Sequence, residues 1–77
     1  MKKVTIYSTP TCSHCKSAKA FFNENNVEYV EYDVALDEAR RSEMIDKSGQ
    51  MGVPVIEIDD KMVVGFDKDK VSEMLGL

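Results

Sequence analysis

Residues 4–22 read VTIYSTPTCSHCKSAKAFF. The apolar run at residues 4–7 predicts a short buried strand, and the Ser, Thr and Pro that follow predict the turn that ends it. After Cys15, apolar side chains recur at helical spacing as far as Phe22, and polar residues come next, which predicts a helix. A pair of cysteines, Cys12 and Cys15, therefore lies where the strand passes into the helix.

The next segment predicts that the sheet begins with two parallel strands. Residues 27–34 alternate apolar side chains with Glu and Asp, which indicates a second strand. A strand, a helix and a strand within about thirty residues form a crossover unit, in which the two strands lie parallel.

The second half of the chain predicts a helix, a hairpin and a closing helix. Residues 36–48 have a weak helical pattern that ends at Gly49, an expected C-terminal cap. Residues 55–58 and 62–64 are expected to form an antiparallel hairpin around a turn of two Asp residues, and residues 67–77 a last helix. The expected apolar side of the first of these helices consists of Leu36, Ala39, Met44 and Ile45.

Together these elements predict one α/β domain over residues 1–77. The order βαβαββα gives a four-stranded mixed sheet with three helices on its faces. A chain of 77 residues leaves no segment for a second domain.

Composition excludes several classes of function. The net charge is −4, with ten basic residues scattered among fourteen acidic ones, which disfavours nucleic acid as a partner. The apolar run near the start stops at Ser8, too short for an export signal, and nothing approaches a membrane span. We therefore expect a cytoplasmic protein, in which two close cysteines are more often catalytic or metal-binding than a structural staple.

The position of the cysteines predicts thiol chemistry. Unpaired N–H groups and the dipole at a helix N-terminus stabilise a thiolate, so Cys12 is expected to be the reactive thiolate. Cys15 lies almost one helical turn further on and on the same face, where it is expected to resolve a mixed disulfide formed at Cys12. His14, between them, would favour the thiolate further if it were an imidazolium, or else is an ordinary surface residue.

Other uses of the two cysteines are weaker or remain open. A structural zinc site usually needs four ligands, and the chain has two cysteines and one histidine. A disulfide that closes so short a loop would stabilise the fold little. A carrier of soft Cu(I) remains an alternative function, although Pro10-Thr11 precedes Cys12 where such carriers resemble one another in a Met-x-Cys approach.

These residues resemble the glutaredoxin family over essentially the whole chain. The resemblance is carried by residues 4–15, by residues 31–34, by SGQMGVPV at residues 48–55 and by Gly65-Phe66-Asp67. It implies a thioredoxin-like fold in its minimal glutaredoxin form and a dithiol thiol–disulfide oxidoreductase with Cys12 and Cys15 as its catalytic pair. It also implies a cis peptide bond before Pro54, which leaves the backbone of Val53 free to bind a substrate as an added strand.

The resemblance further implies a set of binding residues and partners. The substrate or glutathione would be bound by Thr11, Ser13, His14, Val53, Pro54, Gly65, Phe66 and Asp67. The protein would act as a monomer on disulfide-containing proteins, with no obligatory cofactor and with glutathione or a flavoprotein reductase of the thioredoxin-reductase type as electron donor. An iron–sulfur cluster shared between two copies, and a native selenocysteine at position 12, are further alternatives within the family.

One departure from the family pattern bears on the electron donor. Glutaredoxins that use glutathione have a Gly-Gly pair before the last helix, and this chain has Val64-Gly65. Gly65-Phe66 is closer to the redoxins that a thioredoxin-reductase-type flavoenzyme recharges, but Asp67-Lys68 stands where those relatives have Arg-Pro. We expect the flavoprotein donor to be favoured over glutathione.

Overall fold

The computed structural model describes residues 3–50 and 52–77. Residues 1 and 2, which enter the expectation about an export signal, and Met51 within the 48–55 motif lie outside the described residues. The elements, in chain order, are β1 (Val4–Ser8), α1 (Ser13–Glu24), β2 (Val30–Asp33), α2 (Glu38–Ser48), β3 (Val55–Ile58), β4 (Lys61–Val64) and α3 (Lys68–Leu75).

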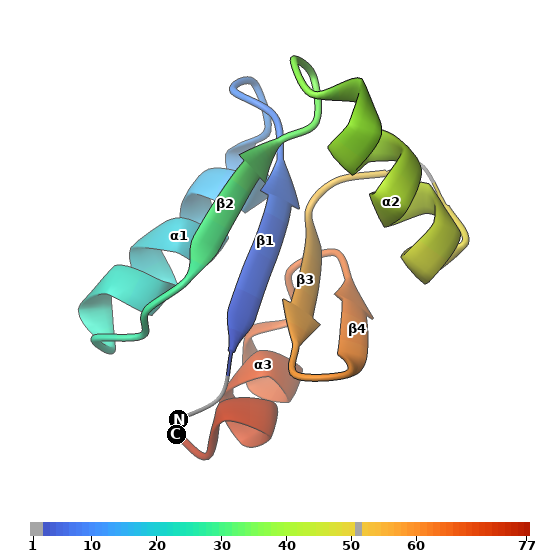
Figure 1. Ribbon diagram of the computed structural model, residues 1–77. Helices are drawn as coiled ribbons and strands as arrows, with labels where there is room; N and C mark the ends of the chain where they lie inside the picture. The colour runs from blue at the N-terminus through green and yellow to red at the C-terminus, as the bar shows by residue number, and fades with distance from the viewer. Residues whose placement is uncertain (1–2, 51) are drawn as a thin grey trace.

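The sheet has the topology that the sequence predicts. Its strand order is β2-β1-β3-β4, with β1 parallel to β2 and the pairs β1–β3 and β3–β4 antiparallel (Figure 1). The crossover through α1 accounts for the parallel pair, and Asp59, with a φ of 55°, makes the tight turn of the hairpin. The α/β class, the mixed four-stranded sheet and the order βαβαββα are confirmed.

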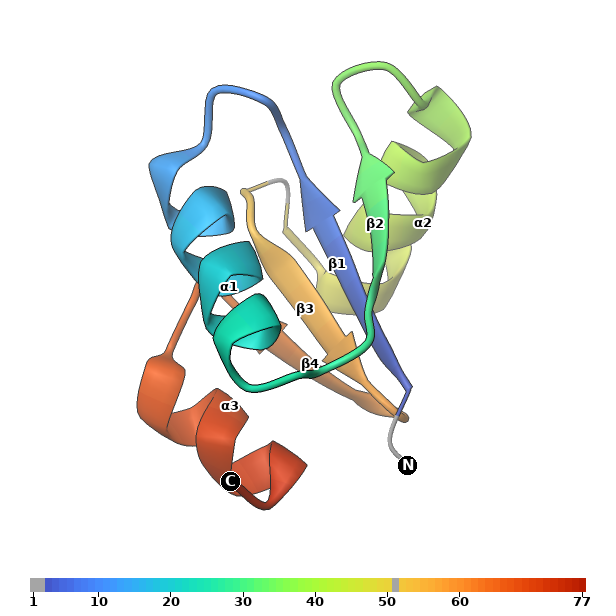
Figure 2. The same ribbon diagram turned by 90° about the vertical axis from the view of Figure 1, so that its left-hand side faces the viewer.

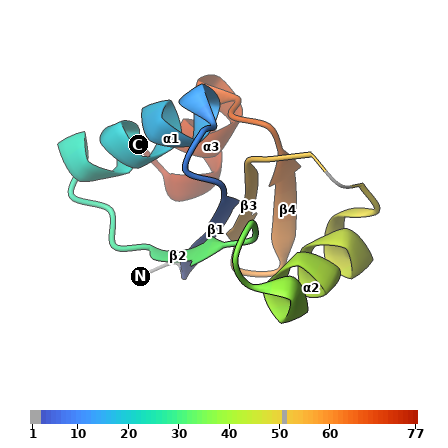
Figure 3. The same cartoon turned by 90° about the horizontal axis from the view of Figure 1, so that it is seen from above.

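The helices cover both faces of the sheet. Seen from above, α1 and α3 lie on one face and α2 on the other (Figure 3). Strand side chains alternate between these faces, so Ile6 packs towards α1 and α3, whereas Tyr7 packs towards α2.

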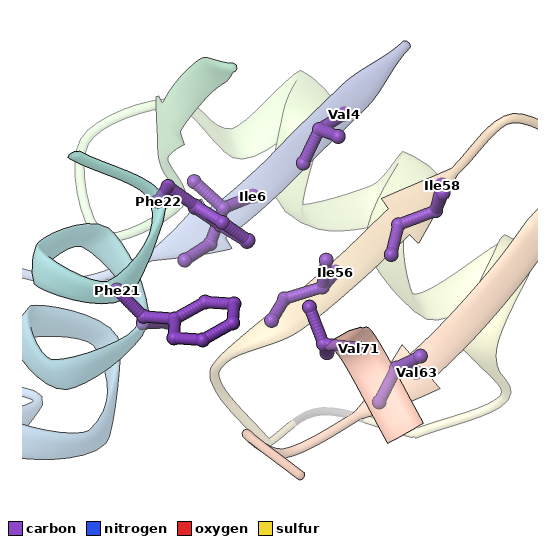
Figure 4. Packing of buried hydrophobic residues seen from close by; sticks show 9 residues of the cluster. Val4, Ile6, Phe21, Phe22, Ile56, Ile58, Val63 and Val71 are labelled. Carbon is purple, nitrogen blue, oxygen red and sulfur yellow. The ribbon is translucent and has the colours of Figure 1, made fainter. Parts of the chain in front are cut away.

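The larger core lies between the sheet and the α1–α3 layer. Figure 4 shows Phe21 and Phe22 of α1 and Val71 of α3 directed at Ile6 and Ile56 in the central strands. The smaller core under α2 contains the buried Tyr7, Val34, Met44 and Val55.

The predicted start of the second helix is wrong. Helix α2 begins at Glu38, because the side chain of Asp37 caps it by accepting a hydrogen bond from the N–H of Arg40 (3.1 Å). Leu36 therefore lies in the preceding turn and is 84% exposed, and Ala39 is also exposed. Of the predicted apolar side, Met44 is buried and Ile45 is half-buried.

The second strand is shorter than predicted. It begins at Val30, since Val27 already donates its N–H to the carbonyl of Phe22 at the end of α1 (2.8 Å). Asn26, with a φ of 56°, turns the chain between the two elements.

Candidate functional site

Cys12 caps the first helix of the fold. It has an extended backbone conformation (φ −86°, ψ 113°), and its carbonyl accepts the N–H of Lys16 (3.3 Å). Its Sγ accepts a hydrogen bond from the N–H of Cys15 at 3.2 Å. Sulfur thus occupies the place that a Ser or Asp oxygen takes in an ordinary N-cap, where it satisfies an N–H of the first turn.

The two thiols differ in exposure. Both are free, and Cys12 is partly exposed whereas Cys15 is completely buried. Burial, followed by a hydrogen bond with Cys12, raises the pKa of Cys15 to about 12. At neutral pH, Cys15 is therefore a protonated thiol behind an accessible Cys12.

The residues around Cys12 in the sequence lie at the surface. Thr11, Ser13 and His14 are exposed, and Ser13 and His14 form the start of α1. Their side chains are available to a molecule that approaches Cys12. The role of His14 stays a prediction.

The start of β3 lies beside the start of α1. Figures 2 and 3 agree on this arrangement. The peptide bond between Val53 and Pro54 is cis, as the resemblance implies, and Pro54 is buried while Val53 is half-buried. The carbonyl of Pro54 accepts the N–H of Gly65 (2.8 Å), which ties the end of β4 to this segment. The tertiary fold thereby brings the motif at residues 48–55 into contact with the motif at residues 65–67.

The three residues after β4 have structural contacts of their own. Gly65 adopts a φ of 80°, a conformation that glycine accepts without strain. Phe66 packs on Phe21 with ring centroids 5.7 Å apart. The side chain of Asp67 caps α3 by accepting the N–H of Lys70 (3.2 Å). A binding role for these residues stays a prediction.

A polar cluster that includes Lys19, four residues after Cys15, was not found from the sequence. Glu31 of β2 accepts hydrogen bonds at Oε2 from Lys19 Nζ (2.6 Å) and from the buried Ser8 Oγ (2.8 Å). Lys19 stands four residues after Cys15, so the helical spacing could have placed its amine on the same face as the thiol. The partner on β2 could not be identified in this way, because it depends on strand register.

In residues 3–50 and 52–77, no group of three or more His, Cys, Asp or Glu side chains is arranged to hold a metal ion. Among the same residues, no helix has both the length and the apolar character needed to cross a membrane.

A cysteine pair at the start of the first helix, beside a cis-proline at the start of β3, in a βαβαββα sheet defines a thioredoxin-like protein. The family model described as Glutaredoxin matches residues 4–63. The chain therefore belongs to the glutaredoxin family, and family and fold support a thiol redox function.

Individual proteins agree with this assignment. An uncharacterised glutaredoxin-like 8.6 kDa protein of the rubredoxin operon of Clostridium pasteurianum is 43% identical over 94% of this chain and 96% of its own length. Glutaredoxin 3 of Escherichia coli is 39% identical over 87% of this chain and 81% of its own. The crystal structure of a glutaredoxin from Archaeoglobus fulgidus has a TM-score of 0.87 at 28% identity and covers 97% of this chain and 87% of its own.

Proposed function

We propose that this protein is a dithiol thiol–disulfide oxidoreductase that reduces protein disulfides or mixed disulfides through Cys12 and Cys15. The observation that carries the proposal is the contrast between the two cysteines. Cys12 is partly exposed and caps α1, whereas Cys15 is fully buried and donates its N–H to Cys12 Sγ at 3.2 Å. An accessible sulfur at a helix N-terminus can reach a substrate disulfide. A buried thiol beside it can reach only the intermediate.

The reaction has two exchange steps. The Cys12 thiolate attacks one sulfur of the substrate disulfide, the substrate S–S bond breaks, and the other substrate sulfur leaves as a thiolate that takes up a proton. Cys15 then loses its proton and attacks Cys12 Sγ. The bond from Cys12 to the substrate breaks, the second substrate thiol leaves, and two electrons have passed from the protein to the substrate.

The substrate would bind across the cis-proline. The backbone of Val53 can pair with an extended peptide as an added strand, which holds the peptide's disulfide over Cys12. Thr11, Ser13 and His14 would border the peptide on the helix side, and Gly65, Phe66 and Asp67 on the side of β4. The exposure of the first three residues and the hydrogen bond from Gly65 to Pro54 support this proposal.

The electron donor would be a flavoprotein reductase of the thioredoxin-reductase type in preference to glutathione. Val64 pairs with Val55, the residue after Pro54, and its side chain is 54% exposed. A branched side chain at this point hinders the close approach of a small ligand's carboxylate to the backbone. Both donors belong to a reducing cytoplasm, where the protein would act as a monomer.

Reduction of insulin or of a mixed disulfide tests this function. Catalysis is measured in parallel with glutathione plus its reductase and with a thioredoxin-reductase system. We expect turnover that depends on Cys12 with at least one of the two donors. A protein that binds Cu(I) or an iron–sulfur cluster but turns over neither substrate would contradict the proposal.

A further inference from the structure

The second exchange step requires a proton to leave a buried group. In the reduced protein, Cys15 is completely buried, and burial, followed by the hydrogen bond with Cys12, raises its pKa to about 12. Once Cys12 is joined to the substrate it carries no charge, and burial is the cause that continues to disfavour the Cys15 thiolate. A thiol must become a thiolate before it can attack a disulfide. Without a group that stabilises this charge, resolution of the mixed disulfide would be slow at neutral pH.

Lys19 is the cation positioned to supply that stabilisation. It lies four residues after Cys15, on the same face of α1, and its side chain is only 27% exposed. Burial and Cys12 raise the pKa of Cys15, whereas a backbone hydrogen bond with Thr9 and the charge of Lys19 lower it. Cys12, Thr9 and Lys19 thus act on the Cys15 thiol, and Lys19 is the cation among these three.

The ammonium group of Lys19 is fixed by the sheet below it. Ile6 and Glu31 are register partners in the parallel pair of β1 and β2, so Glu31 points to the α1 face, as Ser8 does two residues after Ile6. Glu31 Oε2 accepts one hydrogen bond from Lys19 Nζ at 2.6 Å and another from Ser8 Oγ at 2.8 Å.

The chemistry of this cluster keeps both ions charged. The hydrogen bond to Glu31 raises the pKa of Lys19, and the hydrogen bonds from Lys19 and Ser8 lower the pKa of Glu31. Because Ser8 is 1% exposed, its hydroxyl has little water to compete for it, which favours a fixed position of the carboxylate. A free surface lysine would instead sample many rotamers and extend into solvent.

We propose that Lys19 stabilises the thiolate of Cys15 during resolution of the mixed disulfide, and that Glu31 and Ser8 are positioning residues that hold its ammonium group. The inference rests on the proposed function. The Cys15 proton passes to solvent, Cys15 Sγ bonds to Cys12 Sγ, and the sulfur of the substrate leaves with the electron pair of the broken bond.

A chromogenic aromatic disulfide, dithiobis(nitrobenzoate), separates the two steps. Attack by Cys12 releases one aromatic thiolate in a phase that depends on reagent concentration. Resolution by Cys15 releases a second aromatic thiolate, in a phase whose rate does not depend on reagent concentration. Stopped-flow absorbance across a pH series gives both rate constants in the full chain.

We expect Lys19→Met to slow the second phase about tenfold and to move its pH profile up by about one unit, the size of effect expected when one nearby opposite charge is lost. The first phase should keep its rate.

Lys19→Arg should restore the second phase. Glu31→Gln and Ser8→Ala should slow the second phase, with smaller shifts of its pH profile. Lys16→Met removes a lysine from an exposed position of the same helix and is the matched control, with both phases unchanged.

The outcomes separate this inference from the proposed function. If the native protein releases both thiolates but Lys19→Met leaves the second phase unchanged, or Lys19→Arg is as slow as Lys19→Met, the inference is wrong and the function stands. If the native protein releases only one thiolate and forms no Cys12–Cys15 disulfide, both are wrong. Thermal melts of each variant identify loss of folding, and Glu31→Gln tests the positioning of Lys19 without altering α1.

Discussion

The N–H of Cys15 donates a hydrogen bond to Cys12 Sγ at 3.2 Å, so the first turn of α1 is capped by the sulfur of one cysteine and contains the other. The contact holds Cys12 Sγ at the end of the helix, where Cys12 is partly exposed, whereas Cys15 is completely buried. The proposed roles of the two cysteines rest on this difference in exposure.

We expect Cys12→Ser to abolish disulfide reduction and Cys15→Ser to leave a protein that attacks but stays joined to its substrate. The reason is that only Cys12 is accessible from solvent, while only Cys15 is placed to resolve the intermediate. Mass spectrometry after incubation with a protein disulfide detects the trapped mixed disulfide. Loss of alkylation in Cys15→Ser together with normal alkylation in Cys12→Ser would reverse the roles.

The stability of the reduced protein should fall at high pH because of Cys15. Burial raises its pKa to about 12 in the folded chain, against about 8.5 when unfolded. A raised folded pKa contributes stability that is present below the unfolded value and is lost as the pH rises through this window. Urea unfolding of the reduced protein should therefore show a steeper fall above about pH 8.5 than the same measurement on Cys15→Ser.

Lysine and tyrosine side chains titrate in the same window, but they are common to both proteins. The difference between the two curves therefore isolates Cys15. Identical slopes would mean that Cys15 is not shielded as the structure indicates.

His14→Ala should make the cysteine pair more reducing. An imidazolium in the first turn favours the thiolate and so stabilises the reduced protein, which makes the disulfide a better oxidant. We expect a native potential between about −180 and −240 mV, less reducing than thioredoxin at about −270 mV. Redox titration against glutathione buffers measures both proteins, and a native value below about −270 mV that His14→Ala leaves unchanged would remove the histidine from this account.

Val64→Gly should raise the rate at which glutathione reduces the oxidised protein. The valine is 54% exposed and pairs with Val55 next to the cis-proline, so its removal opens the backbone to a small carboxylate ligand. The rate with a thioredoxin reductase should change less, since a protein donor binds a wider surface. Rapid reduction of the native protein by glutathione, without response to any thioredoxin reductase, would refute the expected preference.

Met44→Ala should destabilise the protein by about 2–5 kcal/mol, because it leaves a cavity in the core under α2. Leu36→Ala should change the free energy of unfolding by less than about 0.5 kcal/mol, since Leu36 is 84% exposed. Urea unfolding at neutral pH compares the two variants. Equal losses of stability would show that Leu36 is buried in solution.

Local sequence patterns were enough to predict the order of the elements, the sheet type and the cysteine pair at the start of the first helix. These features depend on local patterns: the spacing of apolar side chains, turn-forming residues and the distance between Cys12 and Cys15. The cis bond before Pro54 was expected only from the family resemblance.

Contacts between residues far apart in the chain could not be predicted in this way, because they depend on how the elements pack. Helix α2 begins after its cap at Asp37, so Leu36 lies outside the helix. The register of β1 with β2 places Glu31 in contact with Lys19 and Ser8. The contact between Lys19 and Glu31 joins residues twelve apart on a helix and a strand. Periodicity assigns each residue to a face of its own element, but packing between elements determines which side chains meet across the interface.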